Sequence, residues 1–280
     1  MLQVDRVLVF TRSSTVVAEL GPEPESTRVI GSDPVSRPVL WGQTPPWVGA
    51  IAEIVLCSSI PTQILIGGLL RAAGMPILEG DGRLSLAFVL VLSIADTALL
   101  ITLMVVLTRA HGQRVRDLWL GVRPIRGEVF HGLLLIPLVF LGVVVLLNTM
   151  RIFAPWLHNV PINPLEQLAG TPGQAAIFAV VAIVAGGIRE ELQRAFLLQR
   201  FERHLGGAKV GVVVLSIGFG LGHIVQGWDA VITTGALGAF WAVLYLRRRS
   251  SIAPIVSHSG FNSLEVLRVA VWGATGVPSP

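Results

Sequence analysis

Three short polar groups interrupt the apolar C-terminal half of this 280-residue chain. They are residues 189–194 (Arg-Glu-Glu-Leu-Gln-Arg), 219–223 (Phe-Gly-Leu-Gly-His) and 258–262 (His-Ser-Gly-Phe-Asn). Each group lies in or beside a stretch that is long and apolar enough for a bilayer. An ionisable side chain at the bilayer centre costs about 2.5–3.5 kcal/mol. A membrane protein that keeps a Glu pair, an Arg and two His there is expected to use them.

The acidic group places carboxylates next to a guanidinium. Glu190 and Glu191 precede Arg194 by four and three residues, so either carboxylate can pair with it on one helical face. Neighbouring residues on a helix point about 100° apart, so only one of the two can face a shared site squarely. A carboxylate held beside an Arg suits a general base that activates water. The alternative is an internal salt bridge that joins two helices.

The two His-containing groups offer hydrogen-bond donors. His223 follows Phe219 by four residues, so both are expected on one helical face. His258 and Asn262 have the same spacing, and an imidazole and an amide one turn apart can donate to one oxygen. That arrangement is what an oxyanion site requires. The alternatives are an interfacial or packing role for His223 and a helix–helix contact for the His258–Asn262 pair.

Together the three groups supply the kinds of side chain that peptide-bond hydrolysis needs. A Glu with His223 would activate water, and His258 with Asn262 would stabilise the oxyanion. Two His and one Glu are also zinc ligands. Asn is a poor zinc ligand, however, and the chain has no His-Glu-x-x-His pattern. We therefore expect no metal or other cofactor, while the ligand types leave zinc open.

Composition indicates the elements that must position these residues. The chain is 52% hydrophobic and 14% charged, against about 25% charged in soluble domains, which predicts an all-α polytopic membrane protein. The net charge of +4 comes from Arg between apolar spans and does not indicate nucleic-acid binding. The single cysteine, Cys57, lies in an apolar run and is expected to be buried. No cleavable signal peptide is recognisable.

The chain divides into a tail and a membrane domain. Residues 1–46 are rich in Pro and are expected to be a disordered tail, and residues 47–280 a bundle of about seven to eight helices. Expected spans are 47–70 with a kink at Pro61, 86–107 with Asp96 at mid-depth, 129–147, a helix from 174 through the Glu pair, 210–225, 230–246 and 252–271. The basic segment 109–126 is expected to be a short interfacial helix.

Charge predicts the orientation. Seven spans place the tail, the loop 109–126, the turn 200–209 and residues 247–249 on one side, where most of the Arg residues gather. The positive-inside rule then makes the N-terminus cytoplasmic. The predicted location is the plasma (inner) membrane.

The motifs resemble those of the CAAX prenyl protease and bacteriocin-processing family (Abi or CPBP) of intramembrane proteases. That family has Glu-Glu-x-x-x-Arg, Phe-x-x-x-His and His-x-x-x-Asn/Asp on separate helices in this order. The second and third motifs match at Phe219, His223, His258 and Asn262. The resemblance covers about residues 86–272 and implies an endopeptidase that cleaves a membrane protein or peptide by a glutamate mechanism without metal.

The first motif departs from the family pattern. If Arg194 takes the position of the family Arg, Glu190 takes the second Glu position and Arg189 the first. If the Glu pair is aligned, the Arg comes one residue early. We favour Glu190 as the catalytic carboxylate, because a spacing of four to Arg194 suits an ion pair. Glu191 stays the alternative.

Two other functions compete with the protease. The departure at Arg189 leaves room for an inactive member that binds or scaffolds membrane proteins. A proton-coupled transporter would use Asp96, the Glu pair and the His residues as a relay. A transporter more often shows two related halves, and no internal repeat is recognisable.

Overall fold

The computed structural model describes residues 44–273, and the predicted tail lies almost entirely outside them. The described part is all-α, as predicted, and contains no β-strand beyond an isolated bridge between Leu78 and Leu84. In chain order its helices are α1 Pro46–Leu56, α2 Ile60–Ala72, α3 Leu86–Ala110, α4 Val115–Trp119, α5 Ile125–Phe153, the 3-10 turns Pro155–Leu157 and Glu166–Ala169, α6 Pro172–Val181, a π-helix Ala182–Arg189, α7 Glu190–His204, α8 Ala208–Leu221, the 3-10 turn Ile224–Gln226, α9 Trp228–Arg248 and α10 Ile252–Trp272.

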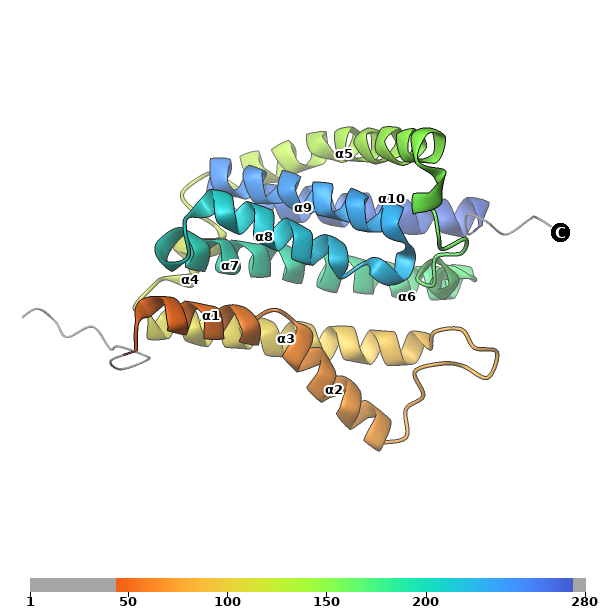
Figure 1. Cartoon of the computed structure of the whole chain (residues 1–280), viewed down its shortest axis with the longest axis horizontal. Helices are drawn as coiled ribbons and strands as arrows, with labels where there is room; N and C mark the ends of the chain where they lie inside the picture. The colour runs from red at the N-terminus through yellow and green to blue at the C-terminus, as the bar shows by residue number, and fades with distance from the viewer. Residues whose placement is uncertain (1–43, 274–280) are drawn as a thin grey trace, which may run out of the picture. The chain divides into compact units, whose positions relative to one another are not determined.

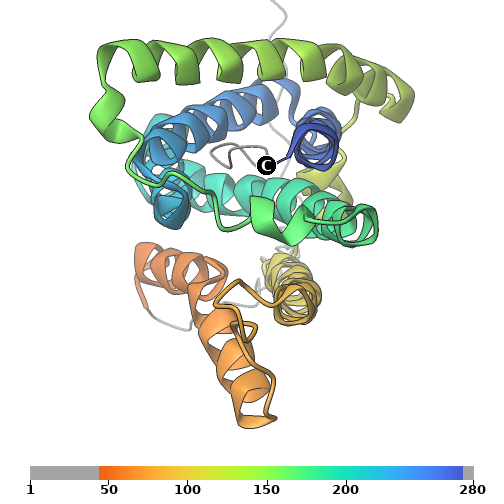
Figure 2. The ribbon, with the colours of Figure 1, turned by 90° about the vertical axis from the view of Figure 1, so that its right-hand side faces the viewer.

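The long helices run side by side, and one continuous helix lies in their middle (Figure 1). This central helix consists of α6, the π-helix and α7. It contacts α3 on one side and α10 on the other. Figure 2, viewed from the end where α10 finishes, shows α1, α2 and α3 on one side of it and α5, α9 and α10 on the other. The Glu pair therefore lies between two groups of helices.

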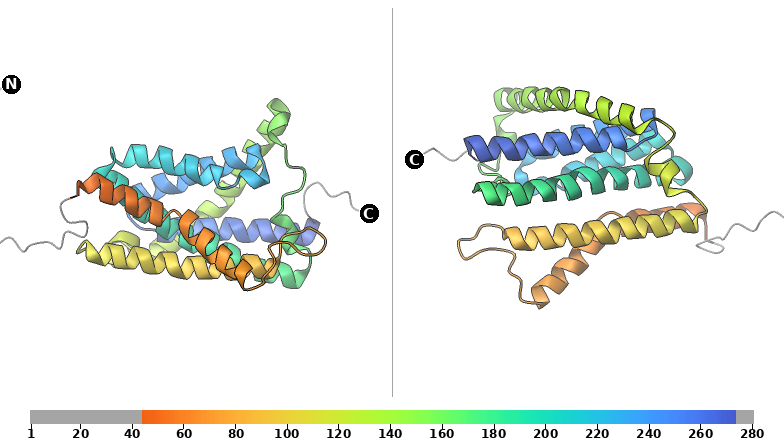
Figure 3. Two further views of the ribbon diagram at one scale, coloured as in Figure 1. Left: turned by 60° about the horizontal axis from the view of Figure 1, so that its bottom comes forward. Right: turned by 180° about the vertical axis from the view of Figure 1, so that it is seen from behind.

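The first predicted span is broken rather than kinked. Helix α1 ends at Leu56, and α2 begins at Ile60 with Pro61 in its first turn, where the missing N–H of proline is tolerated. Ser59, between them, has a left-handed φ of 71°. Figure 3 shows the change of direction between α1 and α2.

The basic segment contains a short helix, as predicted, at Val115–Trp119, and the apolar side of this helix turns into the protein. Leu118 and Trp119 are buried, Trp119 Nε1 donates to Leu192 O at 3.1 Å, and the Tyr245 hydroxyl donates to Leu118 O at 3.0 Å. Because their partners lie on α7 and α9, this segment is part of the core at that end of the bundle.

Four segments of the described chain are long and apolar enough to cross a membrane, namely Pro46–Ala72, Leu86–Ala110, Ile125–Phe153 and Trp228–Arg248. Many apolar side chains on them are exposed, such as Ile64, Leu69 and Leu138. A bilayer would cover such surfaces. The structure thus describes an integral membrane protein, as the composition predicted.

Glycines let the helices that carry the polar groups approach closely. A Cβ on Gly220 of α8 would lie 2.5 Å from Val231 O of α9, and one on Gly238 would lie 3.0 Å from the Phe219 ring. A Cβ on Gly187 would overlap Ser259 of α10. Small residues at helix contacts commonly serve this purpose in membranes.

Candidate active site

The two adjacent carboxylates point to different surroundings. Glu191 is almost completely buried, at 1% exposure, and its Oε1 accepts hydrogen bonds from Arg194 and from His258 Nδ1, the latter at 2.8 Å. The Glu190 side chain is 19% exposed and lies on the wall of a cavity. Glu190 is thus the carboxylate of the pair that a ligand can reach, and Glu191 holds other residues in place.

The expected pairing of Glu190 with Arg194 is wrong. Arg194 pairs with Glu191, three residues earlier, and its guanidinium lies 4.7 Å from the centre of the Phe219 ring. Both spacings allow an ion pair on a helix, so the choice follows from packing. Phe219 and His258 hold Arg194 and Glu191 behind the cavity wall, and Glu190 is left facing the cavity.

His258 lies directly behind the cavity carboxylate. Its ring stacks on Trp241 with centroids 3.7 Å apart, and its Nδ1 contacts Glu191. The other ring nitrogen, Nε2, lies 4.0 Å from Glu190 Oε2. A proton on Nδ1, donated to Glu191, leaves Nε2 free toward Glu190. The stacking and the buried carboxylate together fix the orientation of this imidazole.

His223 is not on the helix where the sequence placed it. Helix α8 ends at Leu221, and His223 follows in the next turn. It stays close to Phe219 all the same, because its Nδ1 lies 2.8 Å from Phe219 O and the two rings meet edge to face. His223 lines the cavity, so the structure brings it to the same site as Glu190 by a different local geometry.

Asn262 also lines the cavity, and one of its amide hydrogens is already used. Its Nδ2 donates to Ala182 O, at the start of the π-helix, at 3.1 Å. A primary amide carries two donors, so one remains for a ligand. Gly186 makes room for this contact, since a Cβ there would lie 2.6 Å from Asn262 Nδ2. π-Helical turns inside α-helices are frequent at functional sites.

Arg189 connects the site to the first helices, and this connection was not predicted from the sequence. Its Nη1 donates to Ser59 Oγ at 2.6 Å and its Nη2 to Glu190 Oε1 at 3.2 Å. Asp96 Oδ2 lies 3.7 Å from Nη1. Asp96 also accepts a hydrogen bond from the Thr62 hydroxyl, so it connects α2 and α3.

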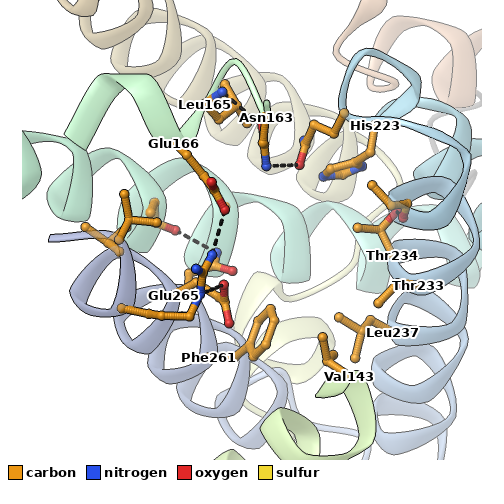
Figure 4. A pocket seen from close by; sticks show the side chains of 18 of the residues that line it. Val143, Asn163, Leu165, Glu166, His223, Thr233, Thr234, Leu237, Phe261 and Glu265 are labelled. Carbon is orange, nitrogen blue, oxygen red and sulfur yellow. Dashed lines mark hydrogen bonds and ion pairs between the residues drawn. The ribbon is translucent and has the colours of Figure 1, made fainter. Parts of the chain in front are cut away.

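The cavity has a volume of about 570 Å³ and combines apolar walls with a polar rim. Figure 4 shows Val143 of α5, Leu237 of α9 and Phe261 of α10 around it, with His223 nearby. At the rim Asn163 donates to Gln226, and Arg268 pairs with Glu166 and Glu265. His158 pairs with Asp229 at 2.7 Å. These dimensions are typical of a site for a ligand of moderate size.

The residues as placed do not fit a zinc site. Catalytic zinc takes three protein ligands. Nowhere in residues 44–273 do three His, Cys, Asp or Glu side chains gather closely enough to hold a metal ion. His258 Nδ1 and His223 Nδ1 are directed at Glu191 and Phe219 O. The chemistry below is therefore derived without a metal.

These features define an all-α integral membrane protein in which a carboxylate, two imidazoles and an amide line one cavity between the helices. Residues 172–264 match the family model "Type II CAAX prenyl endopeptidase Rce1-like". This segment contains all three polar groups, so the family that it matches is the one that the motifs indicated. Comparisons of the chain with curated proteins and with solved structures gave no match.

Proposed function

We propose that the protein is an intramembrane endopeptidase in which Glu190 activates water. The observation that carries this proposal is the division of the Glu pair. Glu190 is on the cavity wall 4.0 Å from His258 Nε2, and Glu191 is buried against His258 and Arg194. A water molecule between Glu190 and His258 could contact both. A general base must lie within hydrogen-bond reach of the water from which it takes a proton, and a water molecule between Glu190 and His258 is within that reach.

The reaction follows from the groups present. Glu190 takes a proton from water as the water oxygen bonds to the carbonyl carbon of the substrate, and the carbonyl π electrons move to its oxygen. The free amide hydrogen of Asn262 is the donor available for that oxyanion, and His223, whose Nδ1–H is held by Phe219 O, adds an Nε2–H as an imidazolium. The oxyanion then collapses, the C–N bond breaks, and Glu190 returns the proton to the leaving nitrogen. The role of His258 shifts from the expected oxyanion donor to the partner of Glu190.

The proposed substrate is a membrane protein or membrane-associated peptide. The cavity lies among helices whose outer faces suit lipid, and its walls include apolar residues that can receive apolar side chains. We place the protein in the plasma (inner) membrane with a cytoplasmic N-terminus, on the charge asymmetry of its loops. Nothing in the chain indicates a prenylated substrate.

The test is cleavage of a library of transmembrane peptides by the purified protein in detergent, beside His223→Ala and His258→Ala. Wild type is expected to cleave, and each His variant to lose about 100-fold or more in turnover, as for lost general acid–base or oxyanion groups. Exhaustive chelation is expected to leave the turnover unchanged. His204→Ala, at the exposed end of α7, is the matched control and should cleave normally. Equal turnover by all the variants would contradict the proposal.

A non-catalytic family member is the second candidate, and Arg189 favours it. Its guanidinium contacts the only cavity carboxylate of the Glu pair at 3.2 Å. A scaffold would bind membrane peptides without cleaving them. Binding of library peptides with no product, by wild type and Glu190→Gln alike, would identify it.

A further inference from the structure

The basic residues of the membrane domain gather at one end of the bundle. This is the end where α3, α7 and α9 finish and where α5, α8 and α10 begin, at the left of Figure 1. The Lys and Arg residues in or beside these helix ends are Arg109, Arg114, Arg116, Arg123, Arg126, Arg203, Lys209, Arg247, Arg248 and Arg249. At the opposite end the basic residues are Arg71, Arg83, Arg151 and Arg268.

The cavity lies in the half of the bundle away from that basic end. Its lining residues on α3 are Val89 and Ser93, near the start of that helix, and those on α5 run from Phe140 to Arg151, near its finish. Its remaining walls come from the central helix between Phe178 and Glu190, from Phe219 and His223, from α9 between Asp229 and Trp241, from α10 between His258 and Val269, and from the loop that contains His158. Figure 4 shows loop residues Asn163, Leu165 and Glu166 at its edge.

The positive-inside rule counts Lys and Arg in short loops close to the membrane, and it does not count net charge. Ion pairs such as Arg248 with Glu128 therefore do not weaken it. The rule assigns the basic end to the cytoplasm whatever the number of helices that cross fully. We infer that the cavity opens on the non-cytoplasmic side of the membrane, and that the substrate is a membrane-anchored polypeptide whose cleaved segment lies on that side.

The polar rim and the apolar deeper walls of the cavity suit such a substrate. The rim at the non-cytoplasmic end has ion pairs and amides, namely Glu166 with Arg268 and Asn163 with Gln226, beside which a polar chain can hydrogen-bond. Deeper residues such as Val143, Leu237 and Phe261 are apolar. A segment that leaves the bilayer would place apolar side chains against these walls and polar ones at the rim. The substrate part of this inference rests on the proposed function, whereas the side of the opening does not.

Cysteine labelling tests the side directly, because Cys57 is the only cysteine and is fully buried. In a Cys57→Ala background, Trp156→Cys marks the cavity end and Val122→Cys the basic end. Both positions are exposed, at 72% and 98%, and both replace apolar residues between the long helices. A membrane-impermeant maleimide is applied to intact spheroplasts and to lysed membranes. Trp156→Cys is expected to react in intact spheroplasts, and Val122→Cys only after lysis.

Labelling of Val122→Cys in intact spheroplasts, with Trp156→Cys protected or equally labelled, would overturn the inference. A second arm uses a library peptide that the enzyme cleaves, fused to a membrane anchor in both orientations. Cleavage is expected only when the peptide is on the non-cytoplasmic side and should be lost in Glu190→Gln. Cleavage only on the cytoplasmic side would refute the substrate assignment. Wild-type turnover by Glu190→Gln would refute the catalytic proposal and leave the labelling result standing.

Discussion

Arg189 is the residue that connects the cavity carboxylate to the rest of the molecule. One arm of its guanidinium contacts Glu190 and the other reaches Ser59, 130 residues earlier in the chain. Asp96 supplies a negative charge 3.7 Å away. A buried Arg with a counter-charge is well suited to orient a neighbouring carboxylate. In this account Arg189, the departure from the family motif, positions the catalytic residue.

Arg189→Gln is therefore expected to lower turnover about 10- to 100-fold, as a misplaced catalytic group does, with KM nearly unchanged. Arg189→Lys should restore part of that loss, because a cation stays beside Glu190. The matched control is Ser59→Ala, which removes one hydrogen-bond partner of Arg189 and leaves its contact with Glu190. The control should lower the melting temperature more than it lowers kcat. A full loss of turnover in Arg189→Lys and in Ser59→Ala alike would indicate a purely structural role.

The sequence predicted which residues gather at the candidate site but did not predict the arrangement in which they do so. The spacings brought Glu190, Glu191, His223, His258 and Asn262 to one region, and the structure places all five within or directly behind one cavity. Which carboxylate faces the cavity depends on helix phase, and the π-helix immediately before the pair changes that phase. No pattern in the sequence predicts this π-helix. Trp241, which stacks on His258, gave no signal either.

At the scale of elements, the approach of α10 to the π-helix decides whether the site can assemble. Gly187 touches α10 so closely that a Cβ would overlap Ser259 Oγ and lie 2.9 Å from Ser259 Cβ. Overpacking of this kind costs about 1–3 kcal/mol. Gly187→Ala is expected to lower the melting temperature in detergent, and to lower turnover because α10 carries His258 and Asn262.

The control for this change is Gly173→Ala in α6, where a Cβ would meet no atom within 4 Å. That variant should match wild type in melting temperature and turnover, since Ala also favours a helix over Gly. Wild-type behaviour of Gly187→Ala would show that the π-helix and α10 are farther apart in the membrane than this packing requires.

Helix positions were more predictable than helix interruptions. The apolar runs located α3, α9 and α10 within three residues at each end and α5 within six, because a membrane span needs about 20 apolar residues. Pro61 indicated a disturbance in the first span, but the break at Ser59 depends on distant partners. Gln193 donates to Cys57 O at 2.5 Å and to Ser59 Oγ at 3.1 Å, so α7 stabilises the break.

At the scale of the whole molecule, composition predicted a polytopic membrane protein, and the charge pattern predicted its orientation in the membrane. Seven to eight spans were expected, and four described segments meet a strict length and hydropathy criterion. The others carry the polar groups or are short, as the central helix and α8 are. Apolar content alone therefore underestimates a span that carries chemistry. Only the fold shows that the cavity lies away from the basic end, because the residues that line the cavity are up to 180 positions apart in the chain, from Val89 to Val269.

The central claim is that Glu190 activates water and Glu191 supports the site from behind. Its most direct test is the turnover of Glu190→Gln beside Glu191→Gln on one cleaved library peptide in proteoliposomes, with the melting temperature of each. Glu190→Gln is expected to keep its melting temperature and lose about 100-fold or more in kcat. Glu191→Gln leaves Arg194 buried without a carboxylate and should be destabilised by about 3–5 kcal/mol. Near-normal kcat in Glu190→Gln, with kcat lost in a stably folded Glu191→Gln, would contradict the account.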